Sequence, residues 1–342
     1  MVIEKQGAHR RWPGSGSGAV VRWRRVVVLV VAIALWGWLL ARWRMAPVRS
    51  DTVAGPNAAA PRLRAHVEML AGTIGERNIW RYDALQRAAE YIERTLASEG
   101  YAPRRQTYDV SKLPVSNVEA TRTGASRRDE VLVVGAHYDS VTGCPGANDN
   151  ATGVAAMLEL AQRFAARRPA RTVRFVAFVN EEPPFFKGPQ MGSVVYASAA
   201  KQRGDRIVGM LSLETMGYYS DERGSQQYPA PIALLYPDVG NFIGFVSNVG
   251  SARLLMTARR AFKRHTAFPL QSAAVPDAIP GVGWSDHWSF WQAGYAAMMV
   301  TDTAPFRYPW YHTPHDTPDK IDYHRLGHLV DGLEAVVAAL AR

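Results

Sequence analysis

Apolar residues recur with a helical spacing in three segments of the chain. In residues 83–99 they fall three or four positions apart, which places them on one face of a helix that Gly100 ends. Residues 326–340 repeat this spacing and predict a helix near the carboxyl end. A shorter amphipathic pattern covers residues 63–70. These patterns predict helices both early and late in the body of the chain.

Other apolar segments are short and rich in β-branched residues, which is typical of strands. The clearest of these segments are residues 131–134, 172–179 and 207–213. Weaker strand patterns cover residues 106–110, which suit an edge strand, and residues 231–236 and 296–301. Residues 241–250 fit either a strand or a helix. Because strands and helices alternate, we expect an α/β fold with a mostly parallel sheet.

The amino-terminal region predicts a membrane anchor. Residues 26–43 are apolar up to Arg42, a length near the lower limit for a membrane-spanning helix. Lys and Arg residues flank this run and are more numerous before it, which favours a cytoplasmic amino terminus. A cleaved signal peptide is the alternative, although no clean small-x-small cleavage site follows before residues 58–60.

This interpretation gives an expected order of segments. Residues 1–25 form a basic cytoplasmic tail, and residues 26–43 form a single transmembrane signal anchor. Residues 44–61 are rich in Ala and Pro and are interpreted as a linker. Residues 62–342 then form one large domain outside the cytoplasm.

The positive charge of the chain is concentrated at its amino terminus. The formal net charge is +10, and residues 1–50 hold nine Lys and Arg residues against one Glu. The rest of the chain is left with +2, so we expect no nucleic-acid partner. The single cysteine, Cys144, excludes an intramolecular disulfide. We interpret Cys144 as a loop residue rather than a ligand or a nucleophile.

Candidate chemistry begins directly after the predicted strand 131–134. His137 lies at the carboxyl end of this strand, and Asp149 lies just before a helical pattern. Imidazole and carboxylate groups are usual zinc ligands, and such strand ends are where sites in α/β sheets are built. Asp139 would accept the second ring N–H of His137. The alternative is that these residues are loop polars and that Asp149 is a helix N-cap.

Three further groups complete a candidate set. Glu181 and Glu182 follow the strand 172–179, Glu214 ends the strand 207–213, and His312 lies in a late loop. Adjacent buried carboxylates are unfavourable unless a cation neutralises them. An exposed acidic turn and a structural histidine are the alternatives. Two histidines and three carboxylates, with a further Glu beside one of them, suit two zinc ions that Asp149 would bridge.

Six segments of the sequence resemble motifs of one enzyme family. They are GAHYDS at 135–140, GANDNATG at 146–153, NEE at 180–182, LETMG at 213–217, SDHWSF at 285–290 and YHTPHDT at 311–317. In order and spacing they are similar to the M28 metallopeptidases, the zinc aminopeptidases that also include the glutaminyl cyclases. The resemblance extends from about Leu63 to the carboxyl end. It implies one α/β catalytic domain of the zinc-exopeptidase type, with a central mixed sheet flanked by helices.

The resemblance also implies a role for each candidate residue. The metal ligands would be His137, Asp149, Glu182, Glu214 and His312. Glu181 would be the general base, and Asp139 would orient His137. The family usually has Asp where this chain has Glu214. This departure leaves a single-zinc site, as in the cyclases, as an alternative to two zinc ions.

The expected function is therefore that of a membrane-anchored zinc aminopeptidase. It would release N-terminal residues from peptides with a free amino terminus, through a metal-activated water and Glu181. A glutaminyl cyclase-like acyltransferase and a non-catalytic ectodomain are the alternatives. Late aromatic residues would line an apolar specificity pocket or pack in the core: Trp284, Trp288, Phe290, Trp291, Phe306, Tyr308 and Trp310.

Overall fold

The computed structural model describes residues 26–28, 30–32, 35, 55–228 and 236–342. Of the predicted anchor 26–43, only seven residues are described, and they are helical. The rest of the anchor, the tail 1–25 and most of the linker 44–61 lie outside the described residues. Among the helices that are described, none is long and apolar enough to cross a membrane. The anchor therefore remains a prediction.

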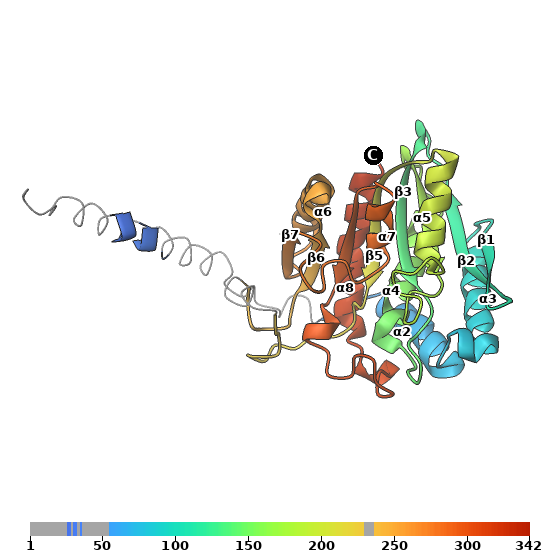
Figure 1. Ribbon diagram of the computed structural model, residues 1–342, viewed down its shortest axis with the longest axis horizontal. Helices are drawn as coiled ribbons and strands as arrows, with labels where there is room; N and C mark the ends of the chain where they lie inside the picture. Colours follow the sequence, from blue (N-terminus) through green and yellow to red (C-terminus); the bar gives the residue numbers. More distant parts are fainter. Residues whose placement is uncertain (1–25, 29, 33–34, 36–54, 229–235) are drawn as a thin grey trace, which may run out of the picture. The chain divides into compact units, whose positions relative to one another are not determined.

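Eight strands form a single sheet in the described part of the body (Figure 1). In chain order they are β1 (Arg104–Val110), β2 (Leu113–Arg122), β3 (Arg127–His137), β4 (Arg171–Phe178), β5 (Arg206–Glu214), β6 (Ile243–Ser247), β7 (Leu270–Ala274) and β8 (Ala297–Thr301). Their order across the sheet is β1-β2-β4-β3-β5-β8-β6-β7. The central strands β4, β3, β5 and β8 are parallel, whereas β1, β2 and β6 introduce antiparallel pairs. The expected central mixed sheet is confirmed.

Helices cover both faces of this sheet, and strand β3 shows why. Leu132 and Val134 contribute to one hydrophobic cluster, while Val131 and Val133 contribute to a second one. Successive side chains of a strand point to opposite faces, so a strand that is apolar throughout needs cover on both sides. The sequence pattern of residues 131–134 is explained by this double burial.

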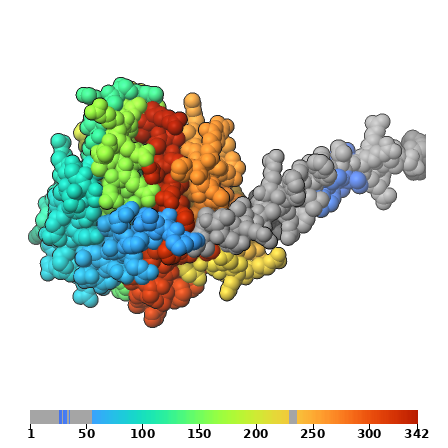
Figure 2. All heavy atoms as spheres, turned by 180° about the vertical axis from the view of Figure 1, so that it is seen from behind, coloured from blue at the N-terminus to red at the C-terminus, as the bar shows by residue number. Residues whose placement is uncertain are grey.

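The larger cluster lies under five helices and the smaller one under two. The larger layer contains α2 (Ala60–Val67), α3 (Tyr82–Ser98), α4 (Thr152–Phe164), α6 (Ala252–His265) and α8 (Tyr323–Leu340). Helix α8 lies between α4 and α6 on this face (Figure 2). The opposite layer contains α5 (Gly192–Arg203) and the short helix α7 (His287–Gln292).

Most of the predicted elements appear where the hydrophobic pattern places them. Helix α3 matches the prediction for residues 83–99, and β1 is an edge strand of the sheet. The ambiguous segment 241–250 contains strand β6. Most of the predicted strand 231–236 lies outside the described residues.

Strand β2 has no prediction, and its turn explains why. A two-residue turn joins it to β1, and Ser111 and Lys112 in that turn adopt φ values of 52° and 68°. Gly and Asn usually occupy such left-handed positions, so the usual hairpin signal is missing from the sequence. The strand itself also carries the buried polar residues Ser116 and Asn117, which hide its apolar alternation.

Candidate metal centre

The parallel strands bring the candidate residues to one edge of the sheet. His137 is the last residue of β3, Glu214 is the last residue of β5, and Glu181 and Glu182 follow β4 closely. Asp149 lies in the turn Ala147–Ala151 that leads into α4. Carboxyl ends of parallel strands share one edge, so residues far apart in sequence meet there.

Asp149 lies between the two candidate histidines. Its Oδ1 is 3.3 Å from Nε2 of His137, and its Oδ2 is 3.0 Å from Nε2 of His312. Glu214 Oε2 lies 3.4 Å from Nε2 of His137, and Glu182 Oε2 lies 3.3 Å from Nε2 of His312. Two three-residue sets therefore share one carboxylate: His137, Asp149 and Glu214 on one side, and Asp149, Glu182 and His312 on the other.

These distances fit a zinc ion in each set. Zinc–ligand bonds of about 2.0–2.2 Å in tetrahedral geometry separate neighbouring ligand atoms by roughly 3.3 Å. Nε2 of His137 is buried and has no hydrogen-bond partner among the described residues. Carboxylate oxygens of Asp149, Glu214 and Glu181 lie 3.3, 3.4 and 3.8 Å from this nitrogen. Buried carboxylates crowded in this way repel one another unless a cation neutralises them. Imidazole nitrogens and carboxylate oxygens are both usual zinc ligands.

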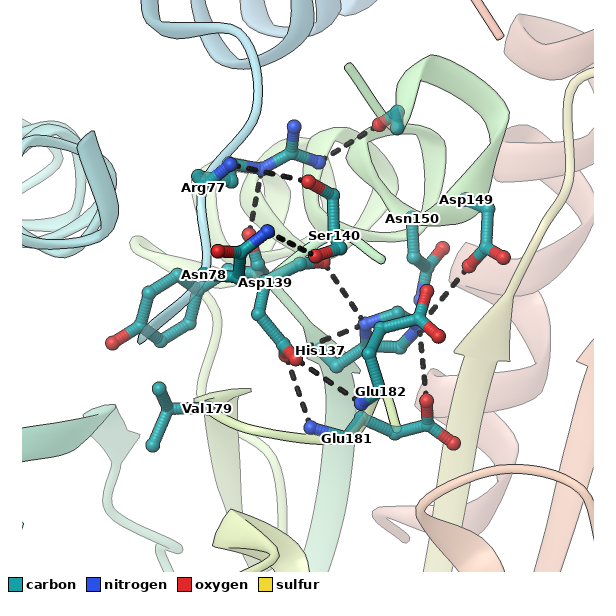
Figure 3. A network of polar contacts seen from close by, with 12 residues as sticks. Arg77, Asn78, His137, Asp139, Ser140, Asp149, Asn150, Val179, Glu181 and Glu182 are labelled. Carbon is teal, nitrogen blue, oxygen red and sulfur yellow. Dashed lines mark hydrogen bonds and ion pairs between the residues drawn. The ribbon is translucent and has the colours of Figure 1, made fainter. Parts of the chain in front are cut away.

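Asp139 connects both sides of this arrangement (Figure 3). Its Oδ1 lies 3.6 Å from Nδ1 of His137, on the ring edge opposite Nε2. The same carboxylate accepts the backbone N–H groups of Glu181 and Glu182, each at 3.1 Å. The hydrogen bond of His137 Nδ1 is instead with the backbone carbonyl of Asp139, at 3.2 Å. Asp139 therefore orients the imidazole through its main chain, and its carboxylate fixes the backbone that carries the two glutamates.

Burial and crowding of carboxylates shift the pKa values of the site. Burial raises the pKa of Glu181 well above its usual value, and Glu214 and Glu182 add to this shift. Burial and Asp149 raise the pKa of Glu182 to about 7. Burial disfavours the charged form of His137, but Glu214 and Glu181 outweigh it and raise its pKa well above the usual range. So many buried acids in one place form a site that a divalent cation would stabilise.

His312 reaches the site from a loop rather than from a strand end. Its φ is 56°, in the left-handed region that residues other than Gly seldom adopt. Tyr311 stacks on its ring, with the ring centroids 3.9 Å apart. The side chain of His312 is 31% exposed, whereas that of His137 is 1% exposed. The set of His137, Asp149 and Glu214 is therefore closed to solvent, whereas the set that contains His312 opens towards solvent.

The matched family agrees with this geometry. Residues 117–337 match the family described as Peptidase family M28, which is more than half of the chain. The chain belongs to peptidase family M28. The predicted resemblance is thereby confirmed, and with it an enzyme of the zinc metallopeptidase class.

Individual relatives and related structures cover most of the chain. The uncharacterized protein YfbL of Escherichia coli (strain K12) is 37% identical over 288 residues, which cover 81% of this chain and 88% of YfbL. The structure of a zinc aminopeptidase from Bacillus subtilis has a TM-score of 0.67 at 17% identity, covering 81% of this chain and 94% of that one. The structure of a Fimbriiglobus ruber glutaminyl cyclase has a TM-score of 0.63 at 21% identity, covering 82% of this chain and 94% of that one. These two structures share the fold of this M28 chain.

Several residues that hold the M28 site in place are absent from the sequence-based prediction. Ser285 donates its hydroxyl to Oε2 of Glu214 at 2.7 Å. Asp316 accepts the backbone N–H groups of Asn148 and Asp149, at 2.8 and 3.1 Å. Ser285 lies in the motif SDHWSF and Asp316 lies in the motif YHTPHDT. These motifs could therefore have indicated both residues. The buried Arg77 also contacts this region, and it lies in no quoted motif.

Two further residues of the quoted segments, His287 of the motif 285–290 and the loop residue Cys144, have other surroundings. His287 is fully buried, shares a hydrogen bond of 2.7 Å with the carbonyl of Val282, and packs edge-to-face on Trp291. Cys144 is buried in the loop, and burial raises the pKa of its thiol to about 12. A thiol that stays protonated is a poor ligand and a poor nucleophile.

Glu214 is expected to hold metal, because its Oε2 faces His137 and Asp149. Glu214→Ala should lower bound zinc by about one ion per chain and should lower turnover with it. Glu214→Asp supplies the carboxylate that is usual in M28 and should retain most of the metal. Metal analysis of both variants beside the wild-type chain checks this. Unchanged zinc and turnover in Glu214→Ala would assign Glu214 a structural role only.

Proposed function

We propose that the chain is a zinc aminopeptidase with two metal ions, which removes N-terminal residues from peptides with a free amino terminus. The observation that carries this proposal is the position of Asp149, whose two oxygens face His137 on one side and His312 on the other. A carboxylate shared between two adjacent three-residue sets suits a pair of zinc ions.

Glu181 is the residue in position to move a proton. Zinc held by these side chains would acidify water and polarise the scissile carbonyl. Oε2 of Glu181 lies 3.8 Å from Nε2 of His137, at the boundary of the closed set. From there its carboxylate accepts the proton of the attacking water and delivers it to the leaving amine. Asp139 keeps Glu181 in place through the backbone N–H at 3.1 Å.

A large apolar cavity adjoins the metal centre and supports a preference for apolar side chains. Its volume is about 350 Å³, and Glu214 and Tyr311 form the wall nearest to the candidate ligands. Among the predicted aromatic residues, Trp284 and Phe306 line this cavity, whereas Phe290 is buried in the core. The remaining lining residues include Phe242, Phe245, Val246, Val282 and Met299. The N-terminal side chain of a peptide would enter this cavity while its α-amine lies among the carboxylates.

The similarity in fold to a glutaminyl cyclase supports a second candidate function, that of a cyclase-like acyltransferase. A cyclase would need a single zinc ion, which one of the two sets could hold alone. The presence of both histidines and of a carboxylate shared between them favours the peptidase. A non-catalytic ectodomain ranks last, because every predicted ligand and the predicted base lie together.

A panel of aminoacyl amides tests the proposed function. Leucine and phenylalanine amides should be cleaved faster than lysine and glutamate amides, because the cavity is apolar. N-acetylation of the substrates should abolish cleavage, and a chelator should do the same until zinc is added back. Cleavage of blocked and free substrates at equal rates would exclude aminopeptidase action. Cyclisation of glutaminyl peptides without amide hydrolysis would favour the cyclase.

We further propose that residues 26–43 anchor the protein in a membrane, with residues 62–342 outside the cytoplasm. The apolar run and its flanking Arg residues support this. A chain that begins near Ala54 should be soluble, folded and active. The full chain should sediment with membranes and be released by detergent but not by salt. Uncleaved full-length protein in the soluble fraction would contradict the anchor.

A further inference from the structure

Arg77 is a fully buried arginine directly behind the loop that joins His137 to Asp149 (Figure 3). Among the residues that the structure describes, its guanidinium donates to backbone carbonyls and to no carboxylate. The acceptors are the carbonyls of Leu70, Gly75, Tyr138, Pro145 and Gly146. A buried charge is costly unless its hydrogen bonds are satisfied, so this position points to a specific task.

Three of these carbonyls belong to the two ends of one loop. Nε of Arg77 donates to Tyr138 at 2.6 Å, one residue after His137, and Nη2 donates to Gly146 at 2.8 Å, three residues before Asp149. One planar guanidinium therefore holds together both ends of the segment between two candidate ligands. Lysine presents a compact charge on a flexible chain and would not span these acceptors in the same way.

The backbone of Arg77 fixes the middle of the same loop. Arg77 N–H donates to Oγ of Ser140 at 3.1 Å, and Ser140 N–H donates to the carbonyl of Arg77 at 2.9 Å. The Ser140 hydroxyl donates in turn to the carbonyl of Cys144 at 2.8 Å. Asp316 holds the N–H of Asp149 from the other side. Hydrogen bonds thus hold the segment from Tyr138 to Asp149 at both ends, and also at Ser140 and Cys144.

The positive charge of Arg77 lies close to the acidic residues of the metal centre. Its guanidinium interacts electrostatically with Asp139, Asp149, Glu182 and Asp316. Burial lowers its pKa to about 10, so Arg77 remains protonated at neutral pH. A fixed positive charge behind these acids reduces their mutual repulsion while no metal is bound.

We propose that Arg77 is a positioning residue that holds the His137–Asp149 loop in its metal-binding geometry and thereby sets the zinc affinity of the centre. Arg77 acts through backbone carbonyls of the loop and is not among the candidate ligands. The inference rests on the proposed function in that zinc is taken as the ion.

Zinc affinity, measured by competition with a chelator, tests this role in two Arg77 variants. Arg77→Lys and Arg77→Gln should bind zinc about 10–100-fold more weakly, the usual loss when a group that orients metal ligands is removed. At saturating zinc, Arg77→Lys should recover most of its turnover with KM little changed. Arg325→Lys is the matched control, because Arg325 is a buried guanidinium that pairs with Asp221 and contacts Tyr219. It should retain wild-type zinc affinity.

A milder variant covers the case in which Arg77 variants do not fold. Ser140→Ala removes the hydroxyl that bonds Arg77 N–H and Cys144, and should weaken zinc binding about 2–10-fold, the worth of one or two hydrogen bonds. Wild-type zinc affinity in folded Arg77→Lys, or in Ser140→Ala if Arg77→Lys does not fold, would overturn the inference. Absence of zinc binding by the wild-type chain would instead overturn the proposed function, so the two failures are distinguishable.

Discussion

Glu181→Gln is expected to abolish most of the turnover and to leave the metal in place. The substitution keeps the size and shape of the side chain but removes its capacity to accept a proton. General-base catalysis is worth about 10²–10⁴ in rate, so turnover should fall by at least about 100-fold. KM and zinc per chain should change little, because the two ligand sets that share Asp149 do not include Glu181. Steady-state kinetics and elemental analysis of the same sample measure both effects.

Glu182→Gln is the matched control for this variant, because it makes the same chemical change one residue later. Oε2 of Glu182 faces His312 at 3.3 Å, and an amide is a poor zinc ligand. Glu182→Gln should therefore be inactive with zinc lost, whereas Glu181→Gln should be inactive with zinc retained. Normal turnover in Glu181→Gln would falsify the assigned base. Loss of zinc in both variants would make Glu181 a ligand, which its place near His137 and Glu182 also allows.

Asp149→Asn should have the largest effect on the metal centre. Asp149 belongs to both three-residue sets, so one substitution weakens both at once. Removing a group that only orients ligands already costs about 10–100-fold in affinity, and a shared ligand should cost at least about 100-fold. Zinc titration followed by turnover checks this.

The control for Asp149→Asn is Asp319→Asn, which removes an exposed carboxylate from the short 3-10 helix Pro318–Lys320. It should keep both zinc and turnover near the wild-type values. Two tightly bound zinc ions and normal activity in Asp149→Asn would contradict the bridging role.

The sequence could place most site residues on the correct element. An apolar, β-branched run followed by His137 predicts a histidine at a strand end, and β3 does end there. The same reasoning places Glu214 at the end of β5. These predictions succeed because the local hydrophobic period and the end of a strand are both visible in a short window.

The local sequence pattern could not predict which of these side chains contact one another. Asp149 and His312 are 163 positions apart, and nothing in their spacing shows that their side chains meet at 3.0 Å. That contact depends on the order of strands across the sheet, where β8 pairs with β5 and β6. Only the six linked motifs together indicated a shared site.

Arg77 illustrates a further limit of the sequence. A charged residue between Glu76 and Asn78 looks like an exposed position, yet its side chain is completely buried. Its partners are backbone carbonyls, and a carbonyl acceptor leaves no mark on residue type. Helix α5 has no sequence-based prediction either. Its small and apolar residues do not fall on one face, so the helical pattern of hydrophobic positions is missing.

Stepwise addition of zinc to the metal-free chain tests whether two zinc ions give the chain its aminopeptidase activity. Turnover of leucine amide and the amount of bound zinc would be measured together at each step. We expect no turnover without zinc, a rise in turnover as zinc binds, and saturation at two ions per chain. Amide hydrolysis that persists at full strength without any bound metal would contradict it, and so would two bound zinc ions with no hydrolysis of any free aminoacyl amide.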